Sequence, residues 1–128
     1  MLDPSNELLR VQSIDELRVW QKTHELSLEE LQKIVHRIQH LISSDIHEAL
    51  KLAEWAVALS LDLKSPFGQG LAMRAKAAAL MKMDERVQAL EYYGKAVQTF
   101  TELDDQLEVA KTLNLRMTAY RDRKSTRL

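Results

Sequence analysis

A repeat inside the chain constrains its fold more than any other feature of the sequence. When residues 48–63 are placed over residues 88–103 at an offset of 40, small and apolar residues coincide: Ala49 with Ala89, Leu50 with Leu90, Ala56 with Ala96, Val57 with Val97 and Leu63 with Leu103. The same offset sets residues 75–80 over residues 115–120. A fixed spacing of this kind is typical of arrays built from one supersecondary unit. We therefore expect two kinds of helix to alternate along the chain.

The composition favours helices and excludes several other classes. The 128 residues include only 3 Gly, 2 Pro and no Cys, which leaves little material for the tight turns of a β-sandwich or for a glycine-rich phosphate loop. A net charge of -1 argues against a general nucleic-acid binder, which must neutralise many phosphates. No apolar stretch is long enough to span a bilayer, and the N-terminus does not resemble a signal peptide. A single all-α domain in the cytoplasm, without a membrane contact, is the expectation.

Apolar spacing and capping signals predict where the helices begin and end. Ser13 with Glu16, and Ser27 with Glu30, fit the capping box that marks a helix N-terminus. Asp45 offers a further N-cap, and proline at position 66 ends the preceding helix. These signals predict six or seven helices, over residues 5–25 (as one helix or two), 28–43, 46–63, 67–83, 84–103 and 105–121.

The segment Ala89-Leu-Glu-Tyr-Tyr-Gly-Lys-Ala-Val97 resembles the second helix of a tetratricopeptide repeat (TPR). The resemblance implies an antiparallel helix-turn-helix array, a right-handed α-solenoid, without catalytic activity. Residues 1–27 would be an N-terminal cap, 28–64 a divergent repeat, 67–103 the best-matching repeat, 105–121 an unpaired helix and 122–128 a basic tail. The long repeat is also similar to N-terminal regions of bacterial TPR-CHAT proteases and signalling proteins, so a regulatory fragment of such a protein is one alternative. A structural homo-oligomer is another.

No pattern in the sequence points to catalysis or to a cofactor. The serines do not lie in a Gly-x-Ser-x-Gly elbow, and Gly68 and Gly70 lack the rest of a phosphate loop. His36 and His40 stand four residues apart, a spacing that two ligands of one metal ion can have. Because no third ligand accompanies them, we expect an exposed pair of side chains and no metal site.

The resemblance implies that a protein or peptide binds the concave surface formed by the first helices of the repeats. The candidate partner-binding residues are Met73, Arg74, Leu80 and Met81 on the first helix of the best-matching repeat, together with Asn114, Leu115, Ala119 and Arg121 on the helix over residues 105–121. Methionine adapts to varied apolar partners, although a methionine stripe is also typical of a packed core.

The helix over residues 105–121 has no following helix to cover it. Its apolar stripe is expected to face the preceding repeat: Leu107, Val109, Ala110, Leu113, Met117 and Tyr120. Leu115 and Ala119 lie on the other side of this helix and would then face solvent. This arrangement predicts an interface at Leu115 and Ala119, either with the same helix of a second copy or with further sequence. Weak nucleic-acid binding through the basic end is the least supported alternative.

Overall fold

The computed structural model describes residues 4–125, with side chains as far as Arg121, and helices joined by loops and turns make up this part of the chain. In chain order they are α1 (Ser5–Leu8), α2 (Ile14–Thr23), α3 (Leu28–Ser44), α4 (Ile46–Leu63), α5 (Pro66–Lys82), α6 (Arg86–Glu102) and α7 (Gln106–Ser125). The expectation of an all-α chain with six or seven helices is confirmed for these residues. Within the same range, no helix is both long and apolar enough to cross a membrane.

The predicted capping residues begin three of the helices. The Ser13 hydroxyl accepts the N–H of Glu16 at the start of α2, which confirms the break between α1 and α2. Ser27 and Glu30 form a complete capping box at α3, in which each side chain accepts the backbone N–H of the other residue. At the start of α4 the Asp45 carboxylate accepts the backbone N–H of Glu48. Each cap supplies an acceptor for an N–H group that the helix itself leaves unpaired.

Left-handed residues end successive helices at a regular interval. Lys64, Asp84 and Asp104 have φ values of 56°, 63° and 55°, and they follow α4, α5 and α6. After both aspartates the backbone makes the hydrogen bonds of a Schellman turn, in which the next N–H reaches back to a carbonyl five residues earlier. The spacing between these residues is half the repeat offset. The chain therefore reverses its direction after the same number of residues in each helix of a pair.

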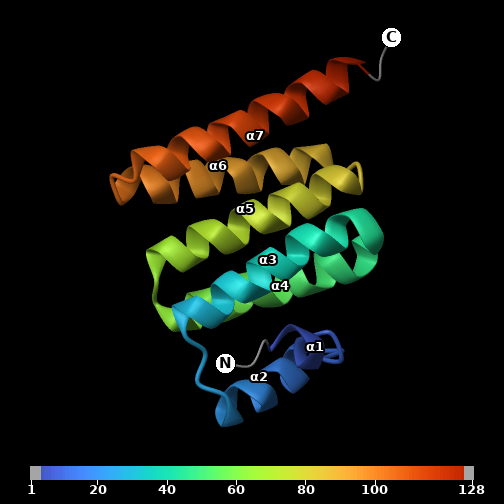
Figure 1. Cartoon of the computed structure of the whole chain (residues 1–128), viewed down its shortest axis with the longest axis vertical. Helices are drawn as coiled ribbons and strands as arrows, with labels where there is room; N and C mark the ends of the chain where they lie inside the picture. The colour runs from blue at the N-terminus through green and yellow to red at the C-terminus, as the bar shows by residue number, and fades with distance from the viewer. Residues whose placement is uncertain (1–3, 126–128) are drawn as a thin grey trace.

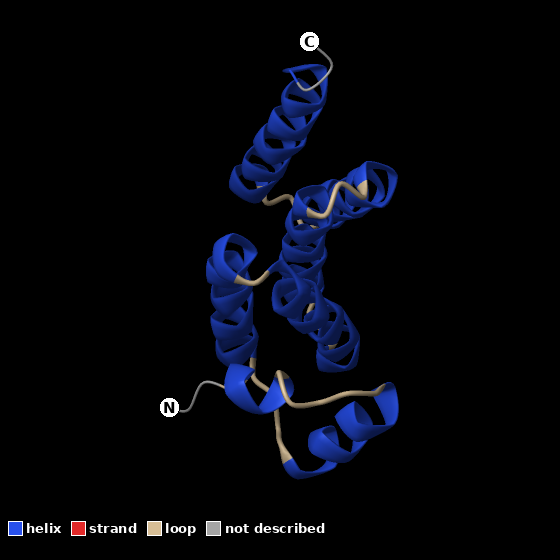
Figure 2. Cartoon of the chain, turned by 90° about the vertical axis from the view of Figure 1, so that its right-hand side faces the viewer, coloured by secondary structure: helices blue, strands red, loops and turns tan. Residues whose placement is uncertain are grey.

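The helices alternate between two sides of the molecule. Consecutive long helices run side by side in opposite directions (Figure 1). When the view is turned, α3 and α7 lie on one side and α4 and α6 on the other, with α5 between them (Figure 2). The central helix α5 packs against α3, α4 and α6. This arrangement leaves α3, α5 and α7 lining a common face.

Small residues form the contacts between neighbouring helices. The repeated alanines Ala49, Ala56, Ala89 and Ala96 are all completely buried. At Gly70 the approach is closer still, because a Cβ atom built there would lie 2.6 Å from Cζ of the buried Phe100 ring. Small side chains at a crossing let two helices approach, and the aromatic ring of α6 then fills the remaining space.

Apolar packing and polar contacts both attach α2 to the body of the molecule. Leu17 is completely buried, and on the exposed side Arg18 and Gln21 both donate hydrogen bonds to the carboxylate of Asp62 at the end of α4. The hydrogen bond from Gln21, together with the bond and charge of Arg18, holds the pKa of Asp62 below its usual value. The N-terminal helices therefore cover one end of the array.

The last helix differs from its prediction in length and in orientation. It continues to Ser125 rather than ending at Arg121, and the rest of the expected tail, residues 126–128, lies outside the described residues. The expected orientation is wrong: Thr112 and Ala119 are the buried positions. The stripe that was expected to face the preceding repeat is exposed at Leu107, Ala110, Leu113, Met117 and Tyr120, and only Val109 is partly buried.

Side-chain size explains why α7 turns this face inward. Ala119 packs in a small cluster with Ala77 of α5 and Tyr93 of α6. Thr112 accepts a hydrogen bond from Arg74 of α5. The inward face of α7 thus carries the small residues that permit close packing, whereas the larger apolar residues lie outside.

Gly70 and Gly94, which both lie inside helices, provide a matched test of the close approach. Gly70→Ala is expected to destabilise the protein by about 1–3 kcal/mol, because the new methyl group overlaps a fully buried ring. Gly94→Ala meets nothing within 4 Å and is expected to stabilise the protein by about 0.5–1 kcal/mol through helix propensity. Urea denaturation measures both free energies of unfolding, and equal stabilisation by the two substitutions would contradict the packing at Gly70.

Candidate protein-binding groove

Two adjoining hollows form one groove on the face that α3, α5 and α7 share. They have volumes of about 520 Å³ and about 310 Å³, and Leu115 and Thr118 of α7 line both. The first is lined by Gln39, Arg74, Lys111, Asn114, Leu115, Thr118 and Arg121. The second is lined by Ile42, Ala78, Met81, Lys82, Arg86, Tyr93, Leu115, Thr118 and Ala119. We call the two together the α3–α5–α7 groove.

Arg74 of α5 links this helix to α6 and α7 beneath the groove. Its Nη1 lies 3.4 Å from Oε2 of Glu108 and donates to the Thr112 hydroxyl at 3.2 Å. The guanidinium carbon lies 5.4 Å from the centre of the Phe100 ring, which places the cation over an aromatic face. The Arg74 and Glu108 side chains are only 14% and 12% exposed, so each charge needs the other for compensation. These contacts fix α7 against α5 and α6.

The groove is basic, although the whole chain is slightly acidic. Five of its lining residues, Arg74, Lys82, Arg86, Lys111 and Arg121, are basic, and none is acidic. Glu108 compensates Arg74 and also lies 3.7 Å from the Lys111 ammonium, so these two cations share one carboxylate. A concave surface lined by one sign of charge attracts ligands of the opposite sign.

The second hollow adds an apolar floor to the groove. Ile42 and Met81 are partly buried, and Tyr93 and Ala119 are nearly completely buried. Burial raises the pKa of the Tyr93 hydroxyl, with Arg74 opposing the shift, so this group is neutral at ordinary pH. An apolar floor beside basic side chains suits a ligand that carries both apolar and acidic groups.

Most of the partner-binding residues predicted from the sequence line the groove. Arg74, Met81, Asn114, Leu115, Ala119 and Arg121 all line it. Two others lie elsewhere, since Leu80 is buried and Met73 packs against the main core. Met73 therefore belongs to the packed core, which was the alternative interpretation of the methionine stripe.

Sequence reasoning missed eight of the lining residues: Gln39, Ile42, Ala78, Lys82, Arg86, Tyr93, Lys111 and Thr118. Lys111 lies four residues before Leu115 and Thr118 three residues after it on the same face of α7, and that helical spacing was a usable signal. Gln39 and Ile42 come from α3. They line the groove only because α3 packs on α5, and no local sequence pattern predicts that contact.

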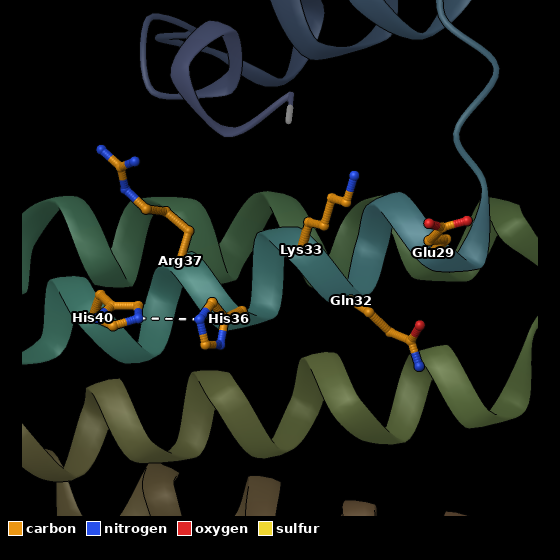
Figure 3. A pocket seen from close by; sticks show the side chains of 6 residues that line it. All are labelled: Glu29, Gln32, Lys33, His36, Arg37 and His40. Carbon is orange, nitrogen blue, oxygen red and sulfur yellow. Dashed lines mark hydrogen bonds between the residues drawn. The ribbon is translucent and has the colours of Figure 1, made fainter. Parts of the chain in front are cut away.

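The histidine pair lies on the exposed surface of α3, as predicted. Nε2 of His36 and Nε2 of His40 are 3.1 Å apart (Figure 3). Lys33 and Arg37 line the same shallow hollow but point away from the two rings. Two nitrogens at this distance can bond one zinc ion at about 2.0–2.1 Å, but a stable site takes three or four protein ligands. No group of three or more metal-ligating side chains occurs among the described residues.

Comparison of the chain with known protein families, with curated proteins and with solved structures found no match. The resemblance to TPR proteins accordingly stays a prediction from the sequence.

The histidine pair gives a prediction about metal. Zinc added at an equimolar concentration is expected to leave the Tm of the protein unchanged, because two exposed ligands bind the ion too weakly to shift the folding equilibrium. Differential scanning fluorimetry with and without zinc checks this. A zinc-dependent rise in Tm that disappears in His36→Ala would contradict it.

Proposed function

We propose that this protein is a non-catalytic interaction module of the TPR type that binds an acidic, partly apolar segment of a partner protein in the α3–α5–α7 groove. The observation that carries the proposal is the groove itself, in which basic side chains from α5, α6 and α7 surround an apolar floor without an acidic lining residue. An extended peptide with aliphatic and acidic side chains complements both properties.

The arrangement of the helices supports the TPR part of the proposal. Helices of two kinds alternate, they reverse at left-handed residues spaced by half the repeat offset, and the repeated alanines are buried at equivalent places. An array in which each unit packs on its neighbour builds an extended concave surface for partners. The proposal includes that this array is a right-handed solenoid.

Selection of peptides from a random linear library on the immobilised protein tests the proposal. We expect the recovered sequences to be enriched in Asp and Glu beside Leu, Ile or Phe. A selected peptide, labelled with fluorescein, is expected to lose affinity when the salt concentration rises from about 0.05 to about 0.5 M, because screening weakens its contacts with the basic groove. Fluorescence anisotropy measures the Kd.

Two substitutions distinguish the groove from the rest of the surface. Leu115→Glu places a carboxylate in the centre of the groove, at a side chain that is already 43% exposed, and is expected to weaken peptide binding at least about tenfold. Val87→Glu adds the same charge on α6, outside the groove, where Val87 is 80% exposed, and is expected to leave the Kd unchanged. Selection of basic peptides, or equal binding by both variants, would refute the proposed ligand.

A further inference from the structure

A continuous apolar stripe on α7 faces away from the rest of the molecule. It is formed by Leu107, Ala110, Leu113, Met117 and Tyr120, all of which are exposed. At about 100° per residue, this α7 stripe lies nearly opposite the buried positions Thr112 and Ala119. The α3–α5–α7 groove is centred on Leu115 and Thr118 and shares none of the five stripe residues, although Arg121 at its edge lies next to the stripe. Contiguous exposed apolar surface on one helix face marks an interaction site.

The internal repeat indicates which kind of structural element would cover this stripe. At the offset of 40, Leu107, Ala110 and Met117 correspond to Phe67, Gly70 and Ala77 of α5. Those α5 residues contact α6: Phe67 packs edge-on to Phe100 at 5.9 Å, Gly70 lies under the same ring, and Ala77 clusters with Tyr93. The α7 stripe is thus the equivalent of a surface that an antiparallel helix covers.

A second copy of α7 fits this surface in the antiparallel direction. A two-fold axis beside Leu113 brings Ala110 opposite Met117 of the second copy, and Leu107 opposite Tyr120 of the second copy. At Ala110 and Met117 a small residue then meets a large one, as Gly70 meets Phe100 inside the molecule. An isologous contact of this kind uses the same patch on both copies and closes on itself.

Charge complementarity favours a second copy of α7 over an unrelated helix as the partner of this stripe. Residues 101–108 include four acidic residues and no basic one, whereas residues 116–125 include four basic residues and one acidic residue. At the acidic end, Asp104 and Asp105 line a hollow of about 360 Å³ that continues onto Val109, Ala110 and Leu113. Antiparallel pairing brings the exposed Arg121 of the second copy to this hollow, where opposite charges attract.

We infer that the protein forms a symmetric homodimer through the antiparallel pairing of its α7 stripes. Sedimentation velocity on the full chain, from about 1 to about 200 µM, tests this over the affinity range of a modest interface. The wild type is expected to shift from monomer to dimer within the series. A wild-type monomer at every concentration would overturn the inference.

Matched variants locate the contact. Leu113→Glu places two carboxylates at the two-fold axis and is expected to raise the dissociation constant at least about 30-fold. Leu61→Glu, at an exposed side chain of α4, is expected to dimerise like the wild type. Far-UV circular dichroism checks that both variants keep their helices. Dimerisation of Leu113→Glu with wild-type affinity would overturn the inference.

A charge exchange tests the antiparallel direction. Asp104→Lys is compatible with the left-handed backbone at this position, because Lys64 has the same conformation at the equivalent turn. Asp104→Lys and Arg121→Glu are each expected to weaken the dimer about threefold or more, and the double variant to recover most of the loss. Absence of recovery would contradict the antiparallel pairing. Leu115→Glu leaves the α7 stripe intact and is expected to dimerise normally, so the groove and the dimer are tested separately.

Discussion

The close approach of helices at small side chains is the constraint on which the rest of this structure depends. Gly70 allows the ring of Phe100 to lie against the backbone of α5, and the buried alanines of α4 and α6 repeat the same principle. Because each helix contacts its neighbours closely, the chain buries apolar surface although its helices are rich in alanine. The positions of the small residues, rather than the amount of apolar surface, determine which face of a helix points inward.

This constraint explains the two surfaces of α7. Its small residues Thr112 and Ala119 face the array, and the salt bridge from Arg74 to Glu108 holds that face in place. As a consequence, one edge of α7 contributes Leu115, Thr118 and Arg121 to the basic groove, while the large apolar residues of the opposite face are directed outward. A single packing choice therefore creates both the peptide-binding groove and the dimerisation surface that we propose.

Local signals predicted the helices well, because their causes are local. The caps at Ser13, Ser27 and Asp45 bond to backbone atoms only three residues away, so the sequence around each is sufficient. The orientation of α7 was not predicted, because amphipathic spacing places the most hydrophobic residues inward, whereas the residue of α7 that packs in the cluster with Tyr93 is the small Ala119. The contribution of Gln39 to the groove depends on the packing of α3 on α5, which lies beyond any local pattern.

The orientation of α7 is the central claim, and thiol accessibility tests it directly, since the chain has no native cysteine. Thr112→Cys and Met117→Cys differ by five positions on one helix, yet Thr112 is completely buried and Met117 is 58% exposed. The rate of reaction with a thiol reagent is measured at sub-micromolar protein, where a modest dimer is dissociated. We expect rapid labelling at position 117 and strong protection at position 112. Protection at position 117 with rapid labelling at position 112 would contradict this orientation of α7.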